Sequence, residues 1–446
     1  MLSSRVHGPL LRQVNANGWA NITRKPMKIN VEMLDEYIRL QEVTNDHQIR
    51  GVITFREHLD VEKLKRSIKK TFNYVPIVGC KYLLQDDKAI WESGSDYSDK
   101  DFFSVSSEKI SEEILLMHLK NIPDQYNGPQ VAFHLVQQDT NDVLIVTLNH
   151  MVFDGSGFKS YLYLLAEVYS NEAQYENKGA EDINLKRHLS LLLKNIPLWQ
   201  QIHSLFRKAI VHDDNKLLIE QSDITETRIC LLKISSKEYQ GVKSLCKIHG
   251  LTINDFILAL MCQAIFSLER YQIDENLTIQ TMFDLRRYVK RYPVSQFGNF
   301  SSMESIQITK RDQSFLGLAN EIGEKMKKIK SRYPGVKNIL LLDTLFKLLP
   351  RKRFENVLSG EIRSLGISTS NLGIIDNSKL SFDNVEVMDV YILTSIKNQP
   401  SLQLTVSTFK ENMTLSMLGN YSDKNWNAVR KICKNMTSLL NDFLNA

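Results

Sequence analysis

The sequence contains little glycine and proline and no long uninterrupted hydrophobic run, and these absences exclude several classes of protein. With 19 glycines and 10 prolines among 446 residues, a collagen-like or low-complexity chain is excluded. The most apolar stretch, residues 253–268, is interrupted by Asn254, Asp255 and Gln263, so we expect no transmembrane segment. A net charge of only +5, without a basic stripe interleaved with aromatic residues, argues against nucleic-acid binding.

Cysteine is also scarce, and its five positions are widely separated. The odd number and the absence of a C-x-x-C pair argue against a disulfide framework and against a zinc cluster. We therefore predict reduced thiols and a cytoplasmic protein. The cysteines are Cys80, Cys230, Cys246, Cys262 and Cys433.

The first 31 residues contain no acidic residue and five basic ones, and they lack the apolar core of a secretory signal. Such a composition loosely resembles a transit peptide. The simpler interpretation is a flexible extension before the patterned sequence begins, and we predict this extension over residues 1–27.

The remaining composition is that of a globular protein, with 43% hydrophobic and 24% charged residues. Alternating apolar runs predict strands, and two pairs of them, within residues 131–148 and 402–418, predict hairpins. Because helices are grouped between hairpins, a doubly wound parallel sheet fits poorly, and we predict a mixed α/β protein in two lobes. Its expected parts are an N-terminal lobe at 28–180, a helical linker at 181–226 that Pro197 breaks, and a C-terminal lobe at 227–446.

The most informative stretch runs from Asn149 to Gly157, directly after a predicted buried strand. A histidine at the end of a strand can face a cleft, and its ordinary pKa suits proton transfer near neutral pH, so His150 is a candidate general base. Asp154 is placed to orient His150 or to hold the loop, and Gly155 and Gly157 are expected to adopt a positive φ. The alternative is a purely structural histidine. We predict no metal site, because no further histidine or cysteine lies nearby at ligand spacing.

This stretch, NHMVFDG, resembles the HxxxDG signature of the chloramphenicol-acetyltransferase-like superfamily. That superfamily includes the condensation domains of nonribosomal peptide synthetases, plant BAHD acyltransferases, polyketide-associated acyltransferases and alcohol acetyltransferases. Further segments resemble the family's other motifs in the same order, from about residue 28 to the end. They are the hairpin over residues 131–154, the helix start GLTINDFILAL at 250–260, FDLR at 283–286, GNFSS at 298–302 and the SNLG turn at 370–373.

The resemblance implies two similar α/β lobes with a channel between them, reached from both faces and with His150 at its centre. In the family the motif histidine removes a proton from a hydroxyl or amine acceptor, which attacks a thioester carbonyl. The motif aspartate is structural and pairs with the arginine of the DxR segment, which here means Asp154 and Arg286. No tightly bound cofactor is expected. The co-substrate is a thioester of coenzyme A or of phosphopantetheine on an acyl carrier protein, and we expect a monomer.

Two other polar residues are candidate contacts for the substrate or the developing oxyanion. Ser156 follows the base, although most loop serines cap helices. Asn371 lies in the SNLG segment, where a structural role in a turn is the alternative. A serine hydrolase is disfavoured, because no serine has G-x-S-x-G flanks.

The chain departs from the family pattern in two places. Asn149 replaces the first histidine of the condensation-domain HHxxxDG motif, and residues 296–300 stand where plant BAHD enzymes carry DFGWG. A plant-type enzyme is therefore disfavoured, and a stand-alone acyltransferase is expected. The alternatives are a carrier-dependent condensation-type amide or ester synthase, a non-catalytic binding copy of the fold, and a thioester hydrolase.

Overall fold

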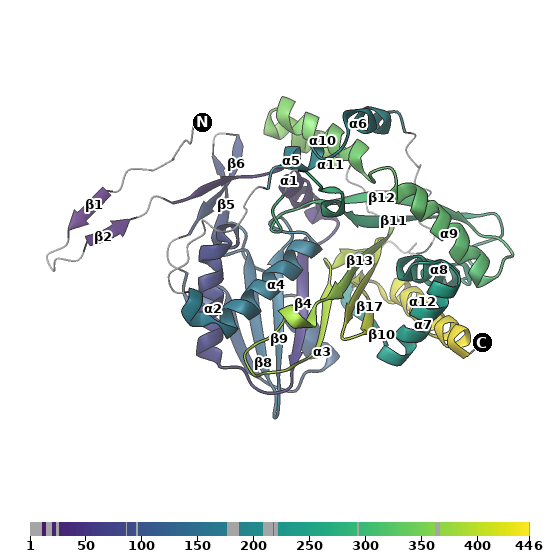
Figure 1. Cartoon of the computed structure of the whole chain (residues 1–446), viewed down its shortest axis with the longest axis horizontal. Coiled ribbons are helices and arrows are strands. Elements are labelled where there is room, and N and C mark those ends of the chain that lie inside the picture. The colour runs from purple at the N-terminus through teal and green to yellow at the C-terminus, as the bar shows by residue number, and fades with distance from the viewer. Residues whose placement is uncertain are drawn as a thin grey trace.

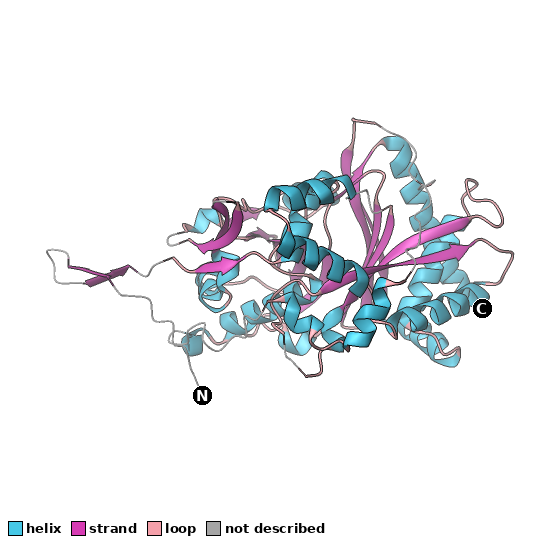
Figure 2. Ribbon diagram, turned by 90° about the horizontal axis from the view of Figure 1, so that it is seen from above, coloured by secondary structure: helices cyan, strands magenta, loops and turns pink. Residues whose placement is uncertain are grey.

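The computed structural model describes residues 11–14, 20–23, 26–85, 87–94, 97–175, 187–207, 217, 222–291, 294–361 and 366–445. Within these residues two large β-sheets run through the middle of the molecule, and helices pack on their outer sides (Figure 1, Figure 2). The predicted mixed α/β class is thus confirmed. The predicted extension at 1–27 lies mostly outside the described residues, apart from the strands β1 Leu11–Val14 and β2 Ala20–Thr23.

The first large sheet has the strand order β14-β4-β9-β8-β7, and the predicted hairpin at 131–148 forms its centre as β8 and β9. Every residue of β9 is buried, because α2 and α4 cover one face and α3 lies against the other (Figure 1). The elements are β4 Gln48–Phe55, β7 Phe103–Ser107, β8 Val131–Gln137, β9 Asp142–Asn149, β14 Val387–Leu393, α2 Val61–Tyr74, α3 Glu112–Leu119 and α4 Gly155–Ser170.

The second large sheet has the order β10-β17-β16-β13-β11-β12, with β15 paired to β17. The apolar helix α8 is buried on nearly all sides beneath α7, α9 and α12, and the Thr252 hydroxyl caps its first turn. The strands are β10 Glu226–Ile234, β11 Asn276–Asp284, β12 Ser301–Thr309, β13 Ile367–Ile375, β15 Lys397–Asn398, β16 Leu402–Phe409 and β17 Asn412–Tyr421. The helices are α7 Ser236–Ile248, α8 Ile253–Phe266, α9 Phe315–Lys330 and α12 Asp423–Asn445.

The remaining elements close one end of the two sheets. The predicted helical linker is broken at Pro197, which stands at the N-terminus of α6. These elements are the strands β3 Lys28–Asn30, β5 Cys80–Gln85 and β6 Lys88–Ser93, and the helices α1 Met33–Leu40, α5 Leu189–Leu193, α6 Leu198–Leu205, α10 Val336–Leu348 and α11 Arg351–Glu361. Short 3₁₀ helices are η1 Gln41–Val43, η2 Pro76–Gly79, η3 Asp99–Asp101, η4 Glu172–Tyr175, η6 Leu285–Tyr288 and η7 Asn377–Lys379.

The C-terminal half of the chain contributes one strand to the first sheet. β14 belongs to the predicted C-terminal lobe, yet it pairs antiparallel with β4 of the predicted N-terminal lobe, from Val387 opposite Phe55 to Leu393 opposite Arg50. The chain enters β14 from β13 of the second sheet and returns to that sheet at β15. The first sheet is therefore built from both halves of the sequence.

The expectation that all five thiols are reduced is wrong for one pair. Cys230 on β10 and Cys433 on α12 form a disulfide, whereas Cys80, Cys246 and Cys262 are free and buried. The bonded residues lie 203 positions apart, so their spacing carries no signal. Only the packing of α12 against β10 brings them together.

No single helix in the described part of the chain is long and apolar enough to cross a membrane; only α7 and α8 taken together, bent by 102°, pass the same test of length and composition.

Candidate active site

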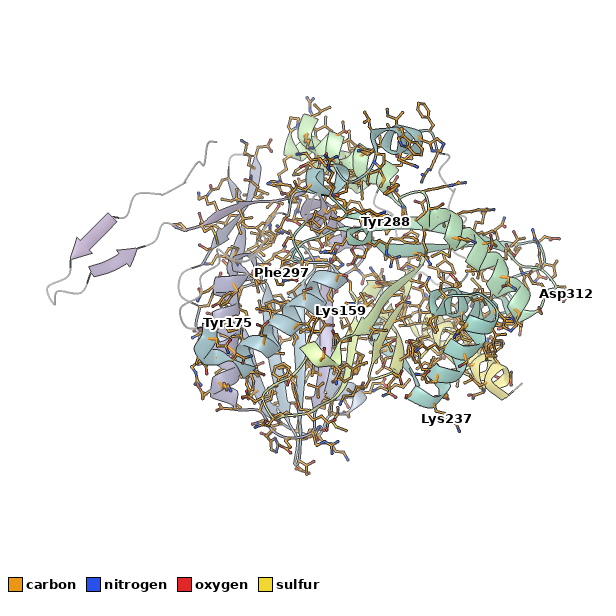
Figure 3. All side chains as sticks on the ribbon, viewed as in Figure 1. Lys159, Tyr175, Lys237, Tyr288, Phe297 and Asp312 are labelled. Atoms are coloured by element: carbon orange, nitrogen blue, oxygen red, sulfur yellow. A yellow bond between two sulfur atoms is a disulfide. The ribbon has the colours of Figure 1, made fainter. Side chains whose placement is uncertain are left out.

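A cavity of about 420 Å³ lies where the two large sheets meet, a volume suited to a small substrate. Its walls come from α1 and α10 at the closed end, from α4, and from β11, β12, β13 and the segment around β15. Lys159 of α4, which lines it, lies near the middle of the molecule (Figure 3). Of the predicted site residues, His150, Gly155, Ser156 and Asn371 line the cavity, and Asp154 and Arg286 lie behind its wall.

His150 follows directly on β9, and its backbone N–H donates to the carbonyl of His47 at 2.9 Å. Its Nδ1 is buried and has no partner in another described residue, so Nε2 is the ring nitrogen left to the cavity. Burial lowers the pKa of His150 below its ordinary value, and the charges of Lys397 and His47 lower it further, whereas its own backbone carbonyl and Asp154 oppose the shift. The ring is therefore neutral at pH 7, the form that can accept a proton.

Asn149, which replaces the first histidine of the longer motif, is fully buried and holds the base of this loop. Its amide donates to Gln130 Oε1 at 2.8 Å, and its Oδ1 accepts from the N–H of Met151 at 3.0 Å. The residue therefore fixes the start of the loop and does not face the cavity.

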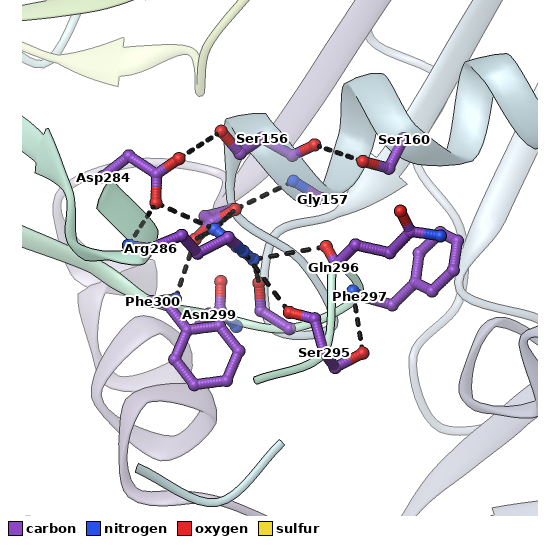
Figure 4. Close-up of polar contacts among 12 residues, drawn as sticks. Ser156, Gly157, Ser160, Asp284, Arg286, Ser295, Gln296, Phe297, Asn299 and Phe300 are labelled. Atoms are coloured by element: carbon purple, nitrogen blue, oxygen red, sulfur yellow. Dashed lines mark hydrogen bonds and ion pairs between the residues drawn. The ribbon is translucent and has the colours of Figure 1, made fainter. Parts of the chain in front are cut away.

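Asp154 does not line the cavity and forms a buried ion pair with Arg286. Figure 4 shows Arg286 with Asp284 and Gln296, which it also contacts. Arg286 Nη1 donates to both carboxylate oxygens of Asp154, at 3.0 and 2.8 Å, and the N–H groups of Gly157 and Phe300 donate at 2.9 and 2.7 Å. Burial raises the pKa of Asp154, but Arg286 and these hydrogen bonds outweigh it and the pKa is lowered overall. The pair ties the loop after β9 to the segment before β12.

Glycine is needed at positions 155 and 157, but not for the predicted reason, because neither Gly155 nor Gly157 has a positive φ. They are required for space. A Cβ on Gly155 would collide with the end of the Leu372 side chain, and one on Gly157 would lie 2.9 Å from Phe153 Cβ and 3.3 Å from the Gln296 carbonyl.

Replacing Gly157 by alanine should therefore destabilise the fold by about 1–3 kcal/mol, despite the better helix propensity of alanine. The same change at Gly155 should cost less, because the leucine side chain can rotate away from the new methyl group. Guanidinium unfolding of both variants shows which of them loses more stability. A Gly157→Ala protein more stable than the wild type would contradict the steric explanation.

Ser156 and Asn371 line the cavity, but both polar groups already have partners. Ser156 Oγ donates to Asp284 Oδ2 at 2.7 Å, and Asn371 Nδ2 donates to Asn254 Oδ1 at 3.2 Å while its Oδ1 accepts from the N–H of Gly373. The prediction of a turn at the SNLG segment is wrong, because this segment is an irregular part of β13. The register with β16 shifts after Asn371, and Gly373 takes a φ of 70°.

Comparisons with solved structures give the same architecture. The TRI3 trichothecene 15-O-acetyltransferase from Fusarium sporotrichioides has a TM-score of 0.65 and 15% identity, covering 97% of this chain and 100% of its own. Polyketide synthase associated protein 5 from Mycobacterium tuberculosis has a TM-score of 0.64 and 12% identity, covering 94% of this chain and 100% of its own. The first condensation domain of the CDA synthetase has a TM-score of 0.65 and 12% identity, covering 93% of this chain and 97% of its own.

The chain has the chloramphenicol-acetyltransferase-like fold. Full-length matches at such low identity establish the fold and its two-lobed arrangement, and they say nothing about the substrate. No protein-family model and no curated protein matches the sequence.

In the chloramphenicol-acetyltransferase-like fold of this chain, sequence reasoning missed three further groups near the cavity: Asn299 lines it, and Asp35 and Arg187 are connected to Asn299 without lining it. Asp35 of α1, fully buried, accepts from Arg187 Nη2 at 2.9 Å and from Asn299 Nδ2 at 3.2 Å. Arg187 and Asn299 in turn donate to the carbonyls of Val152 and Met151 in the loop after His150. Asn299 lies in the GNFSS segment, to which no site role was assigned; Asp35 and Arg187 come from distant parts of the chain, and no local pattern marks them. His47 and Lys397, which line the cavity, were missed for the same reason.

A second cluster of potential metal ligands lies outside this cavity. Carboxylate and ring atoms of Glu108, His118 and His134 come within 4.8 Å of one another at the edge of the first sheet. Both nitrogens of His134 already contact serine hydroxyls, of Ser104 at 2.7 Å and Ser106 at 2.9 Å, and its ring stacks on that of His118. Parallel rings do not aim their nitrogens at a common point, so this arrangement is a hydrogen-bonded network.

Proposed function

We propose that the protein transfers an acyl group from a thioester to a hydroxyl or amine acceptor, with His150 as the general base. The observation that carries the proposal is the His150 ring, which is of intermediate exposure, has a lowered pKa and lines a cavity that elements of both large sheets also line. Asp154 is committed to Arg286, so His150 acts without a carboxylate partner.

The reaction needs one proton relay. His150 Nε2 takes the proton from the acceptor as its oxygen or nitrogen attacks the thioester carbonyl and forms the new bond. The C–S bond then breaks, and the imidazolium returns the proton to the leaving thiolate. Because a thioester is already activated, positioning and this proton transfer are the contributions required of the protein.

The structural neighbours support acyl transfer or condensation as a class of reaction, without a particular donor or acceptor. One of them is an acetyltransferase, and others are condensation domains. The donor is either acyl-coenzyme A or an acyl carrier protein, and the described residues around the cavity do not separate the two.

Mass spectrometry of a pool of acyl-coenzyme A thioesters with mixed alcohols and amines tests the proposal. An acylated acceptor that the wild type forms and a His150→Ala variant does not supports transfer from coenzyme A. Release of free acid, insensitive to added acceptor, identifies a hydrolase instead. No product with free thioesters but product with acyl carrier proteins identifies a carrier-dependent synthase, and silence with both contradicts catalysis.

The lowered pKa of His150 sets the expected pH dependence. A base must be unprotonated, so between about pH 4.5 and 7.5 kcat/KM should fall towards acid pH, with an apparent pKa below the ordinary 6.5 of histidine. The charged and titratable groups that act on the ring are Lys397, His47 and Asp154. The profile is measured from about pH 4.5 to 7.5, with the enzyme returned to pH 7 as a control for unfolding. An acid limb centred above 6.5 would contradict the assignment.

A further inference from the structure

Lys397 is a buried cation at the cavity wall that the mechanism above does not use. It forms β15 with Asn398, lines the same cavity as His150 and is only 6% exposed. Its backbone is held from both sides, by pairing with β17 and by a bridge to Asn45. Its position is therefore fixed by the fold.

The ammonium group of Lys397 lacks a counter-ion in direct contact. Across the described part of the chain, no group makes a hydrogen bond or ion pair with its Nζ, and this atom is not among the fully buried unpartnered atoms, so it borders the cavity. Asp46 acts on it electrostatically, but that carboxylate is already bound by Arg50 and by the N–H of Ile396. A buried charge without a partner is costly, and burial accordingly lowers the pKa of Lys397 to about 8, which still leaves it mostly protonated at pH 7.

The rest of the cavity is also positive. Lys159, Arg287 and Lys397 line it together with a single carboxylate, Asp284. Asp284 is engaged by Ser156 and Arg286, and Lys159 donates to the carbonyl of Leu372 at 2.6 Å. An anion entering the cavity would therefore meet an unsatisfied ammonium donor at Lys397.

We infer that Lys397 binds a carboxylate of the substrate, so that the protein selects an acyl group or an acceptor carrying a free carboxylate near its reacting centre. This inference rests on the proposed acyl transfer at His150. A pantetheine arm is uncharged next to the thioester, and the phosphates of coenzyme A lie at its far end. The anion beside His150 must therefore come from the acyl group, as in a dicarboxylic monothioester, or from the acceptor, as in an amino acid or hydroxy acid.

Matched substrates test this inference and separate the two sources. Succinyl-coenzyme A is compared with butyryl-coenzyme A, L-leucine with L-leucinamide, and lactate with lactamide. The wild type should prefer the charged member either in the coenzyme A pair, where the donor carries the carboxylate, or in an acceptor pair. Lys397→Met, which keeps the length without the charge, should raise KM for that member by about 10- to 100-fold and change the neutral member by only a few-fold. Lys379→Met, at an exposed lysine, is the control and should change neither.

Two results would overturn the inference. If Lys397→Met raised KM equally for the charged and the neutral members, Lys397 would instead act on the oxyanion or support the fold. If the wild type preferred neither member of any pair, there would be no anion site. Unfolding of Lys397→Met addresses the fold directly, because removal of an unpaired buried charge should leave it at least as stable as the wild type.

Binding separates this inference from the transferase proposal. Calorimetric titration of His150→Ala with the same pairs measures recognition without turnover. Tighter binding of the charged member, lost on adding Lys397→Met, supports the carboxylate site even where no product forms. Product formation by the wild type with equal binding of both members supports the transferase and rejects the role of Lys397.

Discussion

Replacement of His150 by alanine should lower kcat/KM by about 10²- to 10⁴-fold while leaving the protein folded. The expected loss is that of the proton acceptor, because the walls of the cavity stay in place. The fold should tolerate the change, since no described side chain hydrogen-bonds to the ring and its Nδ1 is already without a partner. Initial rates of product formation and circular dichroism of the variant measure the two effects.

The matched control is His249→Ala, at an exposed histidine after α7. It should retain the wild-type rate. If His150→Ala keeps product formation within a few-fold of the wild type, then another group accepts the proton, and the base assignment is wrong.

The second large effect is on stability. Asp154→Asn should lower the free energy of unfolding by about 3 kcal/mol, because it leaves the Arg286 guanidinium without its main buried partner. The asparagine oxygen can still accept from the N–H groups of Gly157 and Phe300, which keeps the loss at the lower end of the range for a broken buried pair. Denaturant titration at pH 7 gives the value.

The pH dependence of this loss is a further readout. The lowered pKa of Asp154 means that its contribution is fully present above the ordinary carboxyl pKa of about 3.9 and disappears as pH falls through the lower folded-state value. The difference between wild type and variant should therefore shrink only in strong acid. Glu386→Gln, which removes an exposed partner of Arg56 and Lys410, should change stability far less than Asp154→Asn, because solvent screens these ion pairs. Equal stability of the wild type and Asp154→Asn would show that the pair does not hold the loop.

Local patterns predicted the elements around the motif well. The alternation in residues 131–148 produces β8 and β9, because both strands bury their apolar residues close to where the chain supplies them. Residues that share a motif with a known family were likewise placed at or behind one cavity. Their catalytic and substrate-binding roles remain predictions.

Features set by contacts between distant segments escaped sequence reasoning. Lys397 reaches the cavity through the pairing of β15 with β17, and Arg187 reaches Asp35 across 152 positions of sequence. The glycines after Asp154 show another limit, since a residue chosen for lack of space looks the same in a sequence as one chosen for its φ angle. The Cys230–Cys433 bond depends in the same way on the docking of the final helix.

The strand β14 has a consequence for synthesis. Until it has left the ribosome, one edge of β4 has no neighbour, and an uncovered strand edge invites pairing with other chains. The cavity residues Thr394, Ser395 and Lys397 follow β14 directly, so the step that covers this edge also completes the wall beside His150. We therefore expect a nascent or truncated chain that ends before residue 387 to be prone to aggregation and to lack part of the cavity wall beside His150.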